Sequence, residues 1–183
     1  MDKISQKLLQ IARSTGALLF GEFTLASGKK STYYFDGRLV TLDSEGSYTI
    51  ASSLLPILKE CGAQAIAGPT MGADPIIGAV TILSYIKGYP LRGLMVRKEP
   101  KGHGTKKYVE GKVEPGLKVA VVDDTCTTAQ SLFHAIDALE AEGCQVVKVI
   151  TILDRNQGGS ISLKRKGYDF HALLEADQNG DIH

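Results

Sequence analysis

Two adjacent acidic residues, Asp123 and Asp124, are followed after a two-residue gap by two hydroxyl residues, Thr127 and Thr128. Carboxylates are poorly suited to direct contact with a phosphate, but they accept hydrogen bonds from sugar hydroxyls and orient the water shell of Mg2+. The N-terminus of a helix, by contrast, offers unpaired N–H groups and a partial positive charge to an anion. A helix that begins just after the threonines would therefore complete a site for a sugar phosphate.

The residues before the acidic pair predict the strand that positions it. Residues 118–122 read KVAVV, and such an apolar run is typical of a parallel strand with helices on both faces. In open α/β sheets, ligands bind at the carboxyl ends of the strands, which is where Asp123 and Asp124 stand. Taken alone, the acidic pair is equally consistent with a polar turn between a strand and a helix.

Cys126 lies inside the same turn and is a candidate nucleophile. No second feature of the sequence supports this interpretation, so a variable loop position is favoured. The other cysteines, Cys61 and Cys144, are far away in the sequence, and the three lack the spacing of metal ligands. An odd number of isolated cysteines indicates reduced thiols and a cytoplasmic protein.

Basic residues gather between residues 97 and 116, where four glycines also occur and neither helical nor strand periodicity is present. A solvated charged loop is the interpretation that composition alone favours. However, long loops without secondary structure are uncommon inside compact domains and usually serve as lids or binding loops. We therefore predict a mobile cationic lid. Its basic residues are Arg97, Lys98, Lys101, His103, Lys106, Lys107 and Lys112.

Helical and strand patterns alternate around these two segments. We predict a helix that ends at Gly16, one that runs from a cap at Ser44 to Gly62, one that begins at Asp74-Pro75 with Asp74 as the capping carboxylate, and one over residues 131–141. The buried stripe of the third helix is expected to comprise Ile76, Ile77, Val80, Leu83 and Ile86. Strands are predicted at residues 20–25, 31–40, 64–67, 91–96, 118–122 and 146–153, the first two as a hairpin. This alternation predicts an α/β fold with a central, mostly parallel sheet flanked by helices.

Length and charge restrict the class of protein further. A chain of 183 residues fits a single domain, here residues 1–183. The 21 basic and 20 acidic residues nearly balance, which argues against a nucleic-acid or membrane-surface partner but leaves a small polyanion as a suitable ligand. The first ten residues lack the apolar core of a signal peptide, and no apolar run approaches the roughly 20 residues that span a bilayer. We expect a protein with no membrane partner.

Four segments of the sequence together resemble one enzyme family. Residues 119–131, VAVVDDTCTTAQS, resemble the phosphoribosyl pyrophosphate (PRPP) signature of the type I phosphoribosyltransferases, except that Ala129 stands where that family usually has glycine. The basic segment RKEPKGHGTKKYVEG resembles the catalytic loop of the orotate phosphoribosyltransferases. Residues 23–38, FTLASGKKSTYYFDGR, resemble the hood of that family, and residues 153–159, LDRNQGG, resemble its orotate-binding turn.

The resemblance implies transfer of the phosphoribosyl group of PRPP to N1 of orotate, which gives orotidine 5'-monophosphate and pyrophosphate in de novo pyrimidine (UMP) biosynthesis. It implies the type I phosphoribosyltransferase fold, with a small N-terminal β hood near residues 18–40 and a lid loop near residues 97–116. It also implies Mg2+ that is carried by PRPP, without direct protein ligands and with possible water-mediated contact to Asp123 and Asp124. A homodimer is implied, with Lys98 acting in the neighbouring active site.

The same resemblance assigns roles to individual residues. The implied catalytic residues are Lys101, His103, Asp123 and Asp124. The implied PRPP-binding residues are Arg97, Lys98, Lys101, His103, Asp123, Asp124, Thr125, Cys126, Thr127, Thr128, Ala129, Gln130 and Ser131. The implied orotate-binding residues are Thr127, Arg155, Tyr34 and Phe35, and the planar guanidinium of Arg155 is well shaped to bind a carboxylate.

Some positions depart from the family pattern and leave two other interpretations open. Ala26 replaces a hood lysine of some orotate enzymes, Met71 and Gly72 replace their Tyr-Lys pair, and Lys29 or Lys30 is the expected substitute for the missing charge. A purine phosphoribosyltransferase would share the acidic pair and the phosphate turn, but the hood and Arg155 oppose it. A PRPP-sensing regulator that binds nucleic acid would need a basic face, which the balanced charge opposes.

Overall fold

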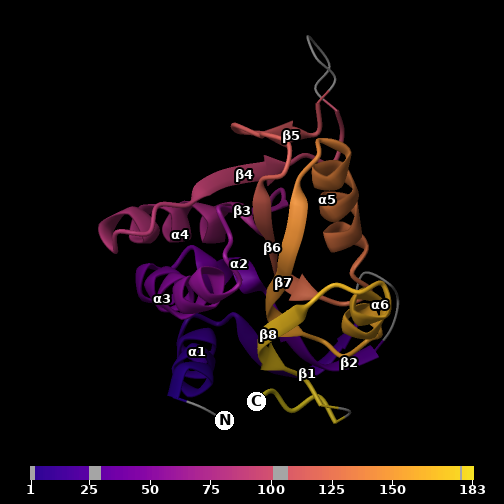
Figure 1. The fold of residues 1–183 in the computed structure, drawn as a ribbon. Helices are drawn as coiled ribbons and strands as arrows, with labels where there is room; N and C mark the ends of the chain where they lie inside the picture. Colours follow the sequence, from indigo (N-terminus) through magenta and orange to yellow (C-terminus); the bar gives the residue numbers. More distant parts are fainter. Residues whose placement is uncertain (1–2, 25–29, 101–106, 178) are drawn as a thin grey trace.

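A six-stranded sheet forms the centre of the protein. The structure is a computed structural model that describes residues 3–24, 30–100, 107–177 and 179–183. Within this described part, the strand order is β5-β4-β3-β6-β7-β8, and all neighbours are parallel except β5, which is antiparallel to β4 (Figure 1). The strands are β3 (Ala65–Pro69), β4 (Arg92–Val96), β5 (Val109–Glu110), β6 (Lys118–Cys126), β7 (Gln145–Asp154) and β8 (Phe170–Glu175). The prediction of a mostly parallel α/β sheet is confirmed.

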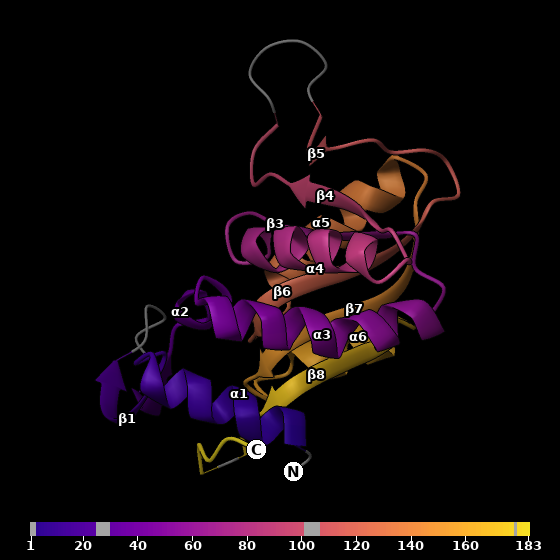
Figure 2. The same ribbon diagram turned by 90° about the vertical axis from the view of Figure 1, so that its left-hand side faces the viewer.

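Helices cover both faces of this sheet, as the apolar run in β6 predicts. The helices α1 (Lys3–Ser14), α3 (Ser44–Glu60) and α4 (Asp74–Ile86) lie on one face, and α5 (Gln130–Ala141) and α6 (Gly159–Arg165) lie on the other (Figures 1 and 2). Side chains of β6 alternate between two apolar clusters. Ala120 and Val122 pack with the first group of helices, whereas Val119 and Val121 pack with α5. Because both faces are covered, side-chain packing holds β6 in place, and its carboxyl end has a defined position.

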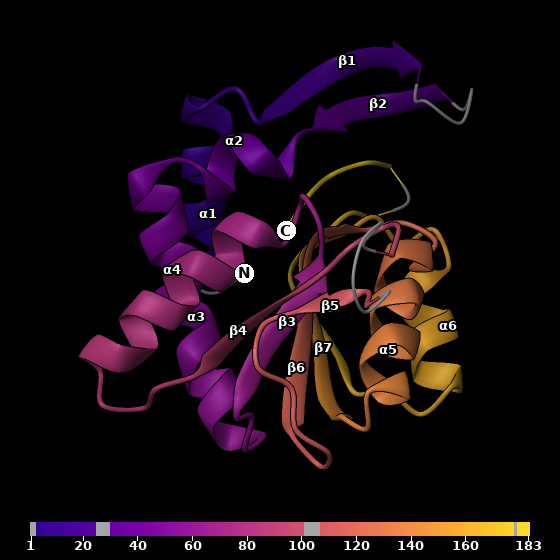
Figure 3. The same cartoon turned by 90° about the horizontal axis from the view of Figure 1, so that it is seen from above.

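The second strand of the hood is shorter than the sequence predicts. Strands β1 (Leu18–Thr24) and β2 (Lys30–Phe35) form an antiparallel hairpin that lies apart from the main sheet (Figure 3). The prediction that the second strand continues to residue 40 is wrong. After Phe35 the chain enters the short helix α2 (Gly37–Thr41), because the side chain of Asp36 accepts a hydrogen bond from the Arg38 N–H and caps it.

Two predicted helix caps are also misplaced by one residue. Helix α3 is capped by Asp43, whose carboxylate accepts from the Gly46 N–H at 2.9 Å, and not by Ser44. Ala73 stands at the N-cap of α4, so Asp74 lies in the first turn and does not cap it. In the same helix Ile86 is exposed. At about 100° per residue, Ile86 lies about 80° around the helix from Ile76, and it joins Ile82 on the outer side.

Further elements were not predicted from the sequence. Strand β5 lies inside the basic segment at residues 97–116, where the periodicity indicated no strand. Helix α6 and strand β8 follow the last predicted strand and complete the sheet edge. Among the described helices, none combines the length and the apolar character that crossing a membrane requires.

Candidate functional site

A cleft of about 790 Å³ opens at the carboxyl ends of the central strands. Its walls come from three places: the end of β2 with the start of α2, the segments that follow β3 and β4, and the turn between β6 and α5. The lining residues are Tyr34, Phe35, Asp36, Gly37, Arg38, Pro69, Thr70, Met71, Gly72, Lys98, Asp123, Asp124, Thr125, Thr127, Thr128, Ala129, Gln130, Ser131 and His134. Ligands in open α/β sheets are expected at this end of the strands. The cleft therefore joins most of the residues predicted from the separate motifs.

The acidic pair occupies the floor of the cleft in two different environments. Asp123 is buried, and its two carboxylate oxygens accept hydrogen bonds from the Asp124 N–H at 2.9 Å and from the Ser131 hydroxyl at 2.8 Å. Burial, followed by the negative charge of Asp124, raises the pKa of Asp123 to about 7. Asp124 is only half-buried and accepts from the Thr125 hydroxyl at 3.1 Å. The more open of the two carboxylates is thus the one that is better placed to meet a ligand.

Two glycines allow the main chain to approach the acidic pair closely. A Cβ added at Gly72 would lie 2.7 Å from Asp123 Oδ1 and 2.8 Å from Asp124 Oδ1. A Cβ added at Gly37 would lie 2.7 Å from the Cβ of Asp124. Because real Cβ atoms essentially never approach so closely, any larger residue at either position requires the acidic pair or the loop to move. The hood and the loop after β3 are therefore in direct contact with Asp124.

The turn between β6 and α5 has the features of an anion site. Ala129 at the N-cap of α5 has a φ of 62°, in the left-handed region, and no side chain in the described part of the protein caps this helix. Hydrogen bonds from the segment after β7 support the turn. The Arg155 N–H donates to the Cys126 carbonyl at 2.9 Å, and the Gly159 N–H donates to the Thr127 carbonyl at 3.0 Å. Two motifs that are separate in the sequence therefore form one unit.

Cys126 is part of this unit but does not face the cleft. It is the last residue of β6 and is fully buried, so it is not the variable loop position that the sequence favours. Burial, with smaller contributions from Asp154 and Asp123, raises the pKa of its thiol to about 12. A thiol protonated at neutral pH is a poor nucleophile, so the candidate nucleophile is excluded. The other cysteines are also free thiols, Cys144 buried and Cys61 half-buried.

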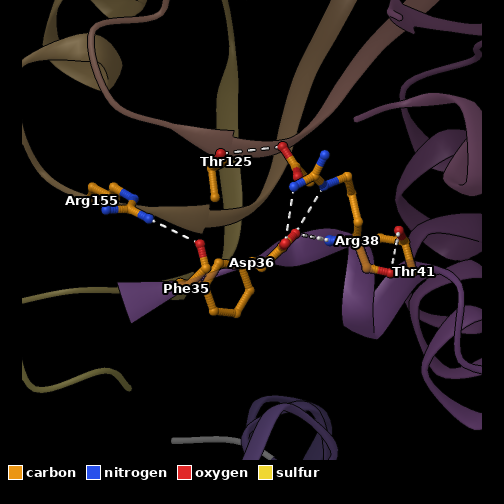
Figure 4. A network of polar contacts seen from close by, with 7 residues as sticks. Phe35, Asp36, Arg38, Thr41, Thr125 and Arg155 are labelled. Atoms are coloured by element: carbon orange, nitrogen blue, oxygen red, sulfur yellow. Dashed lines mark hydrogen bonds and ion pairs between the residues drawn. The ribbon is translucent and has the colours of Figure 1, made fainter. Parts of the chain in front are cut away.

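The hood contributes a charged pair that the sequence interpretation did not include. The guanidinium of Arg38 contacts both carboxylate oxygens of Asp36, each at 2.9 Å (Figure 4). The hydrogen bond from Arg38 is the main reason that the pKa of Asp36 lies below its ordinary value. Both residues line the cleft beside Asp124. The signal in the sequence is the DGR run directly after an aromatic strand, a position that the predicted strand over residues 31–40 includes.

Arg155 contacts the main chain of the hood but does not line the cleft. Its Nη2 donates to the carbonyl oxygen of Phe35 at 3.1 Å (Figure 4). Its guanidinium lies over the ring of Tyr33, 5.4 Å from the centroid. Arg155 lines an adjacent cavity of about 310 Å³ together with Lys30, and neither residue lines the main cleft. Arg155 thus links the end of β7 to the hood from behind the cleft wall that Tyr34 and Phe35 form.

The basic residues predicted between residues 97 and 116 differ in whether they line the cleft. Lys98 follows β4 and lines the cleft of its own chain, whereas the resemblance implied the neighbouring active site. Arg97 does not line the cleft, and its guanidinium contacts Glu110 at 3.4 Å. Lys101 and His103, like Ala26 and Lys29 of the hood, lie outside the described residues. His134 lines the cleft and was missed, although it stands three residues after Ser131 on the same helix, where helical periodicity places both on one face.

The sequence of this chain is similar to those of known proteins along most of its length. Residues 46–168 match the model of the phosphoribosyl transferase domain family. The orotate phosphoribosyltransferase of Synechocystis sp. is 44% identical over 181 residues, which covers 98% of this chain and 89% of that protein. The orotate phosphoribosyltransferase of Aquifex aeolicus is 38% identical over 85% of each chain.

Solved structures show the same architecture. The orotate phosphoribosyltransferase of Mycobacterium tuberculosis in complex with Fe(III) dicitrate superimposes with a TM-score of 0.82 at 31% identity, covering 94% of this chain and 96% of that one. A structure of the same enzyme in complex with PRPP superimposes with a TM-score of 0.78 at 28% identity, over 94% and 96% of the two chains. An adenine phosphoribosyltransferase from Thermoanaerobacter pseudethanolicus shares the fold at 18% identity, with a TM-score of 0.66.

Proposed function

This chain belongs to the orotate phosphoribosyltransferase family, and we propose that its cleft transfers the phosphoribosyl group of PRPP to N1 of orotate. The products are orotidine 5'-monophosphate and pyrophosphate, and the reaction is a step of pyrimidine (UMP) biosynthesis. The observation that carries the proposal is the shared cleft, in which the acidic pair, the helix-capping turn, Lys98 and the hood meet. Each supplies a contact that this transfer needs.

The turn at residues 125–131 is proposed to hold the 5'-phosphate of PRPP. The N-terminus of α5 has no side-chain cap in the described structure, so its N–H groups and the helix dipole favour an anion there. Thr127, Thr128 and the neighbouring Gln130 and Ser131 line the same part of the cleft. Asp123 and Asp124 directly precede this turn in the sequence. From there they can accept hydrogen bonds from the ribose hydroxyls.

The basic residues are proposed to stabilise the leaving pyrophosphate. Cleavage of the bond at C1 of the ribose leaves cationic character on the sugar and negative charge on the diphosphate, so fixed cations lower the barrier. Lys98 lines the cleft and is one of these cations. Following the resemblance, Arg97, Lys101 and His103 are the others, with His103 as the proton donor, and residues 97–116 act as the lid of a single domain.

The hood side is proposed to hold orotate. Tyr34 and Phe35 line the cleft, and so does Thr127 of the phosphate turn, which is proposed to contact the base as well. Arg155 contacts the Phe35 carbonyl at 3.1 Å, and its guanidinium fork is proposed to turn from this carbonyl into the cleft to meet the orotate carboxylate. The hood, near residues 18–40, would then close one side of the base site.

The residues fit Mg2+ that arrives with PRPP. Among the described residues, no three His, Cys, Asp or Glu side chains are grouped as a protein metal cage. Asp123 and Asp124 would contact such an ion through its bound water, while the phosphates of PRPP supply its direct ligands. Bound there, the ion would neutralise negative charge on the diphosphate. Burial raises the pKa of Asp123, and the positive charge of a nearby Mg2+ would act in the opposite direction and favour the ionised carboxylate.

We also propose a cytoplasmic homodimer. The three free thiols agree with a reducing compartment. Large apolar side chains stay exposed on the outer side of α2, α3 and α4, and such a surface is typical of a protein interface. They are Leu39, Leu42, Tyr48, Ile82, Tyr85 and Ile86. Sedimentation should give twice the chain mass, and a Tyr85→Glu substitution should lower it towards the mass of one chain.

The neighbouring-site role of Lys98 is tested by mixing two inactive proteins, Lys98→Ala and Asp124→Asn. If Lys98 acts across the dimer, the mixed dimer contains one complete site and activity returns. If Lys98 serves the cleft that it lines in its own chain, every site keeps one defect and the mixture remains inactive.

A spectroscopic assay of orotate consumption with PRPP and Mg2+ tests the proposed reaction. We expect turnover that Lys101→Ala and His103→Ala each reduce strongly, with Lys107→Ala, outside the assigned set, as the matched control. Consumption of a purine base in place of orotate would identify the purine transferase alternative. PRPP binding without turnover of either base would support the regulatory protein and contradict the enzyme.

A further inference from the structure

His134 lines the cleft, but the proposed reaction gives it no role. Its Nε2 lies 2.9 Å from the carbonyl oxygen of Arg97. Because a carbonyl oxygen can only accept, this nitrogen carries the proton and donates. The imidazole ring also meets the ring of Tyr108 edge to face, with the centroids 5.4 Å apart. His134 therefore contacts the basic segment at two places: Arg97, just after β4, and Tyr108, just before β5.

The main chain at Arg97 is held at both of its polar groups. Its N–H donates to the carbonyl of Tyr108 at 2.8 Å, in continuation of the pairing of Val96 with Val109. Its carbonyl accepts from His134. That carbonyl belongs to the planar peptide group that joins Arg97 to Lys98, so fixing it also fixes the direction in which the chain enters Lys98. Lys98 is the next residue, and its side chain lines the cleft.

The same face of α5 also holds the acidic pair. Ser131 and His134 are three residues apart, so they are neighbours on the helix surface. The Ser131 hydroxyl donates to Asp123 at 2.8 Å, and His134 donates to the strand end that precedes Lys98. The first turns of α5 thus contact both the carboxylate that lies at the end of β6 and the chain that leads into Lys98. The spacing of Ser131 and His134 on the helix therefore links the positions of the two.

We propose that His134 is a positioning residue, which keeps Lys98 at the place in the cleft where PRPP binds. This inference rests on the proposed function to the extent that Lys98 binds the diphosphate of PRPP. His134 itself acts through the Arg97–Lys98 peptide group and does not need to touch the substrate. Its loss should therefore weaken PRPP binding while leaving the orotate side unchanged.

Two substitutions separate the hydrogen bond from the ring contact. His134→Phe keeps a ring against Tyr108 but has no donor, whereas His134→Gln places an amide N–H near the position of Nε2. Titration calorimetry with PRPP and Mg2+ should show about five- to tenfold weaker binding for the His134→Phe protein, the usual effect of one lost hydrogen bond. The His134→Gln protein should bind within about twofold of the wild type. Asp137→Ala, exposed one turn further along α5, is the matched control and should bind PRPP normally.

A double-mutant cycle tests whether the effect passes through Lys98. In a Lys98→Ala background, His134→Phe should cause less than about a twofold further loss, because there is no cation left to position. Full additivity of the two losses would overturn the inference. Failure of His134→Gln to restore binding would overturn it as well.

Calorimetry needs no acceptor base, so the two proposals fail separately. If the variants show this binding pattern but the protein does not consume orotate, the inference stands and the proposed function fails. If orotate is consumed and the His134→Phe protein binds PRPP like the wild type, the proposed function stands and the inference about His134 fails. A wild-type protein that does not bind PRPP would contradict both.

Discussion

The two sides of the cleft are constructed in different ways. The phosphate side comes from one continuous segment, β6, its turn and the start of α5, and the strand beneath it is fully buried between two layers of helices. The base side is assembled from distant parts of the chain. The hood supplies Tyr34 and Phe35, and Arg155 reaches it from the end of β7 about 120 residues later. The hood itself is an exposed two-stranded hairpin, on which Leu19 and Phe20 are open to solvent.

This difference shows how each side of the cleft fixes the positions of its functional groups. On the phosphate side, backbone geometry and adjacent residues fix the relative positions of the carboxylates and the helix N-terminus. On the base side, the hood is joined to the sheet end by a few side-chain contacts: the hydrogen bond from Arg155 to Phe35, the one from Thr32 to Asn179, and the close approach of Gly37 to Asp124. We therefore expect substitutions on the phosphate side to affect the reaction itself, and substitutions on the base side to affect recognition of one substrate.

The largest effect is expected for Asp124→Asn on the phosphate side. Removing the more open carboxylate removes a charge beside the ribose without changing the size of the side chain, so kcat/KM should fall by roughly 100- to 1,000-fold. Steady-state kinetics with both substrates measures this. Asp137→Asn, on the exposed side of α5, is the control and should retain activity. A loss smaller than about tenfold would place the essential charge elsewhere.

A smaller and more selective effect is expected for Arg155→Ala on the base side. The orotate KM should rise by roughly 10- to 100-fold, because a bidentate contact to a carboxylate is lost. The PRPP KM should change by less than about twofold, because the Arg155 N–H that supports the Cys126 carbonyl belongs to the main chain and remains. Arg155→Lys should recover little, since an ammonium cannot form the fork. Equal rises in both KM values would remove the distinction between the two sides.

The buried carboxyl of Asp123 predicts a pH-dependent stability. Its pKa is raised from the ordinary 3.8 to about 7, so between these values the folded protein keeps a proton that the unfolded chain has released. Stability without ligand therefore falls as the pH rises through this range, and the full cost is present above pH 7. Asp123→Asn removes the ionisable group and should raise the free energy of unfolding by on the order of 4 kcal/mol at alkaline pH.

Denaturant unfolding at an acidic and an alkaline pH, without PRPP, measures this difference. The substitution should stabilise the protein at the alkaline pH and have little effect below the ordinary carboxyl pKa. A constant difference across the pH range would show that burial does not govern this carboxyl, and that the phosphate side tolerates an ionised Asp123.

The smallest effect is expected for Ala129→Gly. A left-handed φ of 62° costs a non-glycine residue roughly 1 kcal/mol, which glycine does not pay. Its buried methyl group recovers part of this cost, so the net stabilisation should be below about 1 kcal/mol, a rise of at most a few degrees in Tm. Ala135→Gly, in the buried interior of the same helix, is the matched control and should lower Tm. A lower Tm for Ala129→Gly would show that methyl packing dominates.

The same division explains how much the sequence could predict. The strand, acidic pair and hydroxyl turn are contiguous, so local patterns were sufficient to place Asp123, Asp124 and the turn at a strand end. The parallel sheet was predictable because alternating apolar segments leave few other arrangements. Arg38 was missed because Asp36 converts an apparent strand into a helix start, a choice that depends on one side-chain hydrogen bond.

Other features depend on contacts across the fold. His134 gains its partner from Arg97, 37 residues earlier, and no local pattern indicates that contact. Strand β5 has two residues, too few for periodicity, and it exists because it pairs with β4. Ile86 looked like a core residue from its type, but the end of α4 turns it outward with Ile82. The roles of Lys101 and His103 rest on sequence resemblance, because these residues lie outside the described part.

The unequal environments of the three thiols have a practical consequence for chemical labelling. The pKa of Cys126 is raised to about 12 and that of Cys144 is raised as well, both through burial. Cys61 is half-buried at the end of α3, next to the amino ends of the strands and so at the opposite end of the sheet from the cleft. A maleimide fluorophore at neutral pH should thus attach to Cys61 alone. The unaltered protein therefore carries a single attachment point for a dye or a surface, remote from its substrates.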